Sequence, residues 1–125
     1  MIILTNEQVK FLHQKLIEST GGADGVRDEG LLDSALSAAF QTFDGLELYP
    51  SIAAKIARIA YALISNHPFV DGNKRIGTYV MLVLLELNHI NVDFTDDDII
   101  KIGIETASGK MTDTQILNLI LERSV

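Results

Sequence analysis

Apolar residues recur at the spacing of an α-helix along most of this chain, and this period constrains the fold more than any other feature. The first periodic segment begins at a capping-box pattern, Thr5 followed by Gln8, and the last begins at the same pattern in Thr112 and Gln115. With the other helix-end signals, the period predicts helices over about 6–19, 28–40, 50–66, 73–88, 95–109 and from 112 onward.

One short segment between these helices has the pattern of β-structure. Residues 41–51 contain a turn signal, Asp44-Gly45, followed by alternating apolar residues at Leu46 and Leu48. The predicted fold class is therefore all-α, a compact bundle of about six helices with a small flap hairpin. A chain of 125 residues has the length of one domain, so residues 1–125 are expected to form a single domain.

Composition narrows the classes of function. A formal net charge of −7 argues against a nucleic-acid partner, because such binding relies on basic side chains that neutralise phosphates. The chain has no cysteine, which removes disulfides and thiolate chemistry and suits a reducing cytoplasm. No apolar run approaches the roughly 20 residues of a membrane helix, and no signal peptide is visible. We expect a soluble, cytoplasmic protein that binds neither nucleic acid nor a membrane.

The stretch HPFVDGNKRIG, residues 67–77, is not explained by packing alone. Pro68 forces His67 away from helical geometry, so one helix ends there, and the next begins near Gly72 or Asn73. The first amides of a helix have no partner within it and carry partial positive charge. The loop that leads into this second helix is therefore a candidate anion site.

Side chains in the same stretch supply the other parts of a phosphate site. Lys74 and Arg75 add positive charge, although Lys74 could also be a solvated surface residue. A carboxylate beside bound phosphate is the usual magnesium ligand, so Asp71 is the candidate, with helix capping as the alternative. Neutral His67 can take a proton from a hydroxyl. A base, a metal ligand and a phosphate cradle are the parts that phosphate transfer requires.

The segment HPFVDGNKR resembles the signature of the Fic/Doc superfamily. Fic proteins carry H-P-F-x-[D/E]-G-N-G-R-x-x-R, and the Doc (death on curing) branch carries a related form with N-K-R. Here Lys74 matches Doc, and Thr78 stands where Fic proteins have the second arginine. The chain length, the glycine-rich GGADGVRDEG and the late TASGKMTDTQI also resemble the small Doc-type toxins, so the resemblance extends over the whole chain.

This resemblance implies an enzyme that uses ATP and Mg²⁺ to modify a hydroxyl on a protein. His67 would be the general base and Asp71 would hold the metal. The nucleotide would be bound by Gly72, Asn73, Lys74 and Arg75. Fic enzymes transfer AMP, whereas Doc phosphorylates its target, and Lys74 with Thr78 favours phosphorylation. AMP transfer stays as an alternative, and so does a catalytically inactive nucleotide- or anion-binding module that acts through a partner protein.

The resemblance also implies a toxin–antitoxin setting, with the translation machinery as the class of target. Fic proteins often carry an inhibitory helix with the pattern [S/T]-x-x-x-E-[G/N]. The nearest match here, TGGADG, has Asp24 in place of the glutamate and glycines that disfavour a helix, so a separate antitoxin is expected. Residues 40–49 correspond in position to the flap that docks the target, which would bring a substrate hydroxyl to His67.

The other notable residues are predicted to be structural. His13 and His89 have no partners at ligand spacing and are expected at the surface or its boundary. Residues 96–98, three consecutive aspartates, lack the pattern of a calcium loop and fit a helix start. Gly77 inside a helix predicts close packing against another helix, and Phe69 is expected to point into the core.

Overall fold

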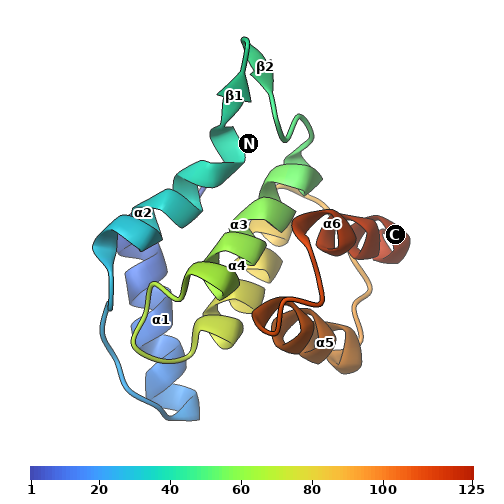
Figure 1. Ribbon diagram of the computed structural model, residues 1–125. Coiled ribbons are helices and arrows are strands. Elements are labelled where there is room, and N and C mark those ends of the chain that lie inside the picture. Colours follow the sequence, from blue (N-terminus) through green and yellow to red (C-terminus); the bar gives the residue numbers. More distant parts are fainter.

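Helix α3 lies at the centre of the structure, and α2, α4, α5 and α6 pack against it (Figure 1). The computed structural model describes residues 1–125. The helices are α1 (Asn6–Thr20), α2 (Glu29–Ser37), α3 (Ile52–Asn66), α4 (Asn73–Leu87), α5 (Asp96–Ala107) and α6 (Asp113–Arg123). A 3₁₀ turn, η1 (Ala38–Phe40), and two short strands, β1 (Thr42–Phe43) and β2 (Leu46–Glu47), lie between α2 and α3. The predicted all-α bundle with one small hairpin is confirmed.

Side-chain hydrogen bonds fix where most of the helices begin. Thr5, Thr95 and Thr112 close capping boxes at the starts of α1, α5 and α6. Asp28 and Ser51 cap α2 and α3 by accepting an amide of the first turn. Helix α4, which opens within the HPFVDGNKR motif, has no side-chain cap.

The predicted helix boundaries differ from the observed ones by a few residues. Helix α2 ends at Ser37, because the chain then tightens into η1. Helix α3 begins at Ile52 rather than at Pro50, because Ser51 occupies the N-cap. None of the helices combines the length and the apolar character needed to cross a membrane.

Helices α3 and α4 approach each other closely at a glycine. Gly77 on α4 faces Ile64 and Ala60 on α3, and a Cβ atom built on Gly77 would lie 2.5 Å from Ile64 Cγ1. The close packing predicted for this glycine is therefore confirmed. It fixes the end of α3 against the start of α4, and the loop between those two ends carries the motif.

The hairpin of β1 and β2 projects from the helices at the start of α3 (Figure 1). Phe43 pairs with Leu46 across it, and these side chains are 71% and 73% exposed. Lys55, a buried residue of α3, contacts the end of the hairpin that leads into the helix. Its Nζ donates to the carbonyl of Tyr49 and lies 3.0 Å from the carboxylate of Glu47. The hairpin is therefore anchored to α3 through a buried cation.

The hairpin and the motif lie at opposite ends of α3. The hairpin precedes the helix, His67 follows it, and a helix of 15 residues spans about 22 Å. The hairpin also points away from the α3–α4 loop (Figure 1). A target docked on the hairpin would therefore have to extend along α3 to bring a hydroxyl to His67.

The C-terminal end of the chain is tied back to the start of α5. Arg123 donates to the Asp98 carboxylate through Nε at 2.9 Å and Nη2 at 3.2 Å. Asp98 also accepts the amide of Thr95, as a helix-start acid should. These hydrogen bonds, that of Arg123 first, lower the pKa of Asp98 from 3.8 to about 2.

Replacing Gly77 by alanine is expected to destabilise the fold, although alanine is the better helix former. The added methyl group overlaps Ile64, and overpacking of this kind costs about 1–3 kcal/mol. Gly103→Ala on α5 is the matched control, because its Cβ would lie 3.5 Å from the nearest atom, Lys74 Cβ, which is an ordinary contact. That variant should gain about 0.5–1 kcal/mol from helix propensity. Urea unfolding of both variants measures the difference, and equal stabilities would contradict this account of the α3–α4 contact.

Acid should weaken the tie between α5 and α6 in a defined pH window. Because the folded state lowers the pKa of Asp98, the stabilisation is complete above its ordinary pKa of 3.8 and is lost as the pH falls toward about 2. Asp98→Asn should therefore lower the melting temperature at pH 7, and its difference from the parent should shrink below pH 4. Asp97→Asn, an exposed neighbour, is the control. A difference that does not depend on pH would contradict the ion pair as its cause.

Candidate functional site

The motif begins where α3 ends. His67 is the C-cap of α3 and adopts a left-handed backbone conformation with φ 51° and ψ 56°. Its side chain is exposed, whereas Pro68 and Phe69 are buried. Phe69, with an exposed fraction of 1%, belongs to the main apolar core, as predicted. The loop is therefore anchored by buried side chains and presents its histidine to solvent.

The start of α4 has free backbone donors. Gly72, with φ 76°, is the N-cap and offers no side chain to the helix. The first amide to bond within the helix is that of Ile76, which donates to the carbonyl of Gly72. The amides of Asn73, Lys74 and Arg75 have no hydrogen-bond partner. A helix start with three free donors and the positive end of the helix dipole has the local structure that binds anions in proteins.

A cleft of about 470 Å³ opens in front of these amides. Its lining contains His67, Val70, Asp71, Gly72, Asn73, Lys74 and Arg75, together with Ala107 from the end of α5. All six candidate site residues of the sequence are thus brought together on one cleft. Lys74 is exposed and forms no ion pair, so its charge is available to a ligand.

The side chain of Asn73 is committed to the loop itself. Its Oδ1 accepts the amide of Phe69 and its Nδ2 donates to the carbonyl of Phe69, both at 3.0 Å. This two-point contact closes the loop between the buried ring and the helix start. Asn73 can therefore serve a bound anion through its backbone amide, while its side chain holds the loop in shape.

Asp71 reaches from the motif to the glycine-rich segment that follows α1. One carboxylate oxygen accepts the amide of Gly72 at 2.7 Å, and the other accepts the amide of Ala23 at 3.1 Å. These amides, that of Ala23 first, hold the pKa of Asp71 below its ordinary value of 3.8. The side chain is 48% exposed, and a carboxylate that accepts one amide on each oxygen can accept further hydrogen bonds. No group of three or more acidic or histidine side chains gathers to hold a metal ion.

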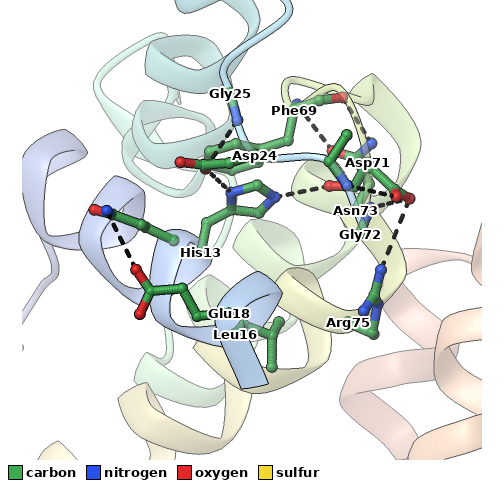
Figure 2. A network of polar contacts seen from close by, with 12 residues as sticks. His13, Leu16, Glu18, Asp24, Gly25, Phe69, Asp71, Gly72, Asn73 and Arg75 are labelled. Carbon is green, nitrogen blue, oxygen red and sulfur yellow. Dashed lines mark hydrogen bonds and ion pairs between the residues drawn. The ribbon is translucent and has the colours of Figure 1, made fainter. Parts of the chain in front are cut away.

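Arg75 also contacts the glycine-rich segment. Its Nη1 donates to the hydroxyl of Thr20 at 2.6 Å and to the carbonyl of Gly21 at 2.8 Å. Its Nη2 lies 3.7 Å from the Asp71 carboxylate (Figure 2). The guanidinium thus fixes the end of α1 against the start of α4. An oxygen ligand at the cleft would share it with these partners.

The prediction that His13 lies at the surface or its boundary is wrong. Its exposed fraction is 1%, and its ring stacks on Phe69 with 3.9 Å between centroids. Figure 2 shows the imidazole between two acidic residues: Nε2 donates to the carbonyl of Asp71 at 2.7 Å, and Nδ1 lies 3.3 Å from the carboxylate of Asp24. His13 therefore packs against the motif loop from the side of the core and holds it through the Asp71 carbonyl.

Comparison with known proteins agrees with this geometry. The model of the Fic/DOC family matches residues 3–85, which include α3, the motif and most of α4. The chain belongs to the Fic/DOC family. It is also 38% identical over 79 residues to "Toxin Doc" of Mycolicibacterium smegmatis. That match covers 62% of this chain and 61% of the relative's length. The predicted membership of the superfamily, on its Doc branch, is confirmed.

Within this Fic/DOC chain, removal of the His13 ring should destabilise the fold. His13→Ala leaves the carbonyl of Asp71 without its partner and opens a cavity beside Phe69, so we expect a loss of about 2–3 kcal/mol. His89→Asn is the control, because His89 is exposed with φ 58° and asparagine tolerates that conformation. Thermal unfolding of both variants tests this. Equal melting temperatures would show that the His13 ring does not stabilise the fold.

Proposed function

We propose that this protein transfers the terminal phosphoryl group of ATP to a hydroxyl on a target protein, with His67 as the general base. The observation that carries the proposal is the uncapped start of α4, because the three residues with free amides line the same cleft as His67. An oxyanion bound by these amides would lie near an imidazole that can accept a proton. Membership of the Fic/DOC family supports the same chemistry.

The residues present fit a nucleotide phosphate. The backbone donors of Asn73, Lys74 and Arg75 follow a left-handed Gly72, so consecutive amides can face one anion. Lys74 adds a charge that no acidic side chain neutralises. A cleft of about 470 Å³ lies within the range typical of small-molecule sites. ATP is therefore the proposed nucleotide.

Asp71 is the proposed contact to Mg²⁺. Magnesium in phosphate sites takes one or two carboxylates, phosphate oxygens and water, and Asp71 offers one half-exposed carboxylate of lowered pKa beside the amides. When bound, the ion would neutralise part of the negative charge of the phosphate oxygens. Within the protein, the Asp71 carboxylate accepts hydrogen bonds from the amides of Ala23 and Gly72. These bonds fix the position of the carboxylate beside the cleft.

His67 would take the proton of the acceptor hydroxyl. Its side chain is exposed at the cleft, so it can reach a group presented by another protein. The neutral imidazole accepts the proton as the hydroxyl oxygen bonds to phosphorus, and ADP would leave.

The residue at position 78 favours phosphoryl transfer over AMP transfer. Thr78 stands where Fic proteins carry a second arginine, and it is buried, with its hydroxyl donating to the carbonyls of Lys74 and Arg75. Gly103 of α5 packs against it, with an ideal Cβ 3.7 Å from Thr78 Cγ2. This side of the cleft therefore offers no second guanidinium to the triphosphate. AMP transfer is the alternative, and a nucleotide-binding module without turnover is the alternative of another class.

We further propose a toxin–antitoxin setting, as the name of the mycobacterial relative suggests. Residues 1–125 would act as one Fic/Doc-type domain that modifies a protein of the translation machinery. A separate antitoxin protein would restrain it in the cytoplasm. The exposed apolar hairpin residues Phe43 and Leu46 are available for a protein partner.

ATP labelled at either the α- or the γ-position tests the reaction. Incubated with a bacterial lysate and Mg²⁺, the protein should transfer label to a protein acceptor from γ-labelled ATP only. His67→Ala should slow this transfer about 10²–10⁴-fold, because it removes the base and leaves the amides in place. Label retained from the α-position would show AMP transfer. ATP binding without any label transfer would show a binding module.

A second measurement tests the role of Lys74 in the proposed phosphate site. Lys74→Ala should weaken ATP binding about tenfold in calorimetry, because it removes the cation that has no partner in the protein. Lys101→Ala is the control, since that lysine is similarly exposed and lies on α5 outside the cleft. Equal affinities for the two variants would exclude Lys74 from the phosphate site.

A further inference from the structure

Three consecutive carbonyls at the end of α3 accept hydrogen bonds from one short stretch of the glycine-rich segment. Arg27 donates through Nη2 to the carbonyl of Asn66 at 2.9 Å and through Nε to that of His67 at 2.7 Å. The carbonyl of Pro68 accepts the backbone amides of Arg27 at 2.8 Å and Asp28 at 3.1 Å. Arg27 therefore touches the peptide of the proposed base and both peptides beside it.

This arrangement replaces the usual end of a helix. The last carbonyls of a helix lack partners within it, and a glycine in the left-handed region commonly resolves this. Here the left-handed residue is His67, with φ 51°, and a residue with a Cβ is strained in that conformation. Such strain persists only where the surroundings fix it. The positive guanidinium at the negative end of α3 supplies two of the bonds that do so.

The Arg27 backbone is itself held in register with the motif loop. Val26 forms an antiparallel bridge with Phe69, and the amide of Val70 donates to the carbonyl of Gly25 at 3.0 Å. Arg27 does not line the cleft and forms no ion pair. Its two side-chain hydrogen bonds to the carbonyls of α3 are thus its specific contribution.

The geometry points to Arg27 as a positioning residue for His67. By fixing the left-handed peptide, it fixes the direction in which the imidazole leaves the backbone at the edge of the cleft. This inference rests on the proposed function of His67 as the base. It adds a residue outside the HPFVDGNKR motif that acts through that base and does not touch the substrate.

Arg27→Gln tests the inference against a purely structural role. The initial rate of acceptor labelling at saturating ATP should fall about tenfold or more, because a displaced base reacts poorly. The KM for ATP should stay within about twofold, since the amides of α4 are unchanged. Arg123→Gln is the matched control: Arg123 also donates through Nε and Nη2, but to Asp98 at the other side of the bundle. That variant should lose stability and keep its rate.

A second readout does not need any activity. The chain has three histidines, so the Cε1–Hε1 signals of His13, His67 and His89 can be assigned by single substitutions and followed by NMR. Arg27→Gln should shift or broaden the His67 signal and leave that of His89 unchanged, whereas Arg123→Gln should leave both unchanged. If Arg27→Gln does not fold, Arg27→Lys takes its place with a smaller expected effect, because lysine keeps the charge but lacks the planar fork that reaches both carbonyls.

The outcomes separate this inference from the proposed function. A parental rate in Arg27→Gln, or an unchanged His67 signal, overturns the positioning role even if label transfer is real. If the parent protein transfers no label at all, the proposed function fails. The NMR comparison then decides alone whether Arg27 sets the orientation of His67.

Discussion

The uncapped start of α4 is the constraint on which the rest of the site depends. Five helices of this protein begin with a side chain bonded to an amide of the first turn, and α4 does not. A helix start with free donors is stable only if the loop that leads into it is held by other means. Here Asn73 clamps the Phe69 peptide, His13 holds the carbonyl of Asp71, and Arg27 holds the end of α3. The donors that remain free belong to Asn73, Lys74 and Arg75, which line the cleft.

The glycine-rich segment after α1 bonds the acidic group that lies beside the proposed anion site. The formal net charge is −7, so the long-range field opposes a polyphosphate. Binding of such a ligand would have to rely on short-range donors. Asp71 turns its charge toward the amides of Ala23 and Gly72, and Arg75 remains nearby with contacts to Gly21. Each carboxylate oxygen of Asp71 thereby accepts one amide of the protein, and Lys74 is left unpaired at the cleft.

Local signals in the sequence predicted the helices, the hairpin and the placement of all motif residues on one cleft, because these features depend on neighbours within a few positions. The contacts that support the motif were not predicted, because they join distant positions: His13 is 58 residues from Asp71, and Arg27 is 40 residues from His67. One signal for His13 was present. It lies midway between Val9 and Ile17, four residues from each, and therefore on the buried stripe of α1. No comparable local signal exists for Arg27.

The position of the hairpin limits how a target can be recognised. Lys55 fixes the hairpin at the first turns of α3, and His67 stands at the other end, about 22 Å away along a helix of 15 residues. A peptide that contacts both would need about six or seven extended residues between its docked part and its acceptor hydroxyl. A folded target could span the same distance with a rigid surface. If a target docks on the hairpin, Phe43→Ser should weaken binding of the acceptor and leave the affinity for ATP unchanged, because no hairpin residue lines the cleft of the proposed nucleotide site.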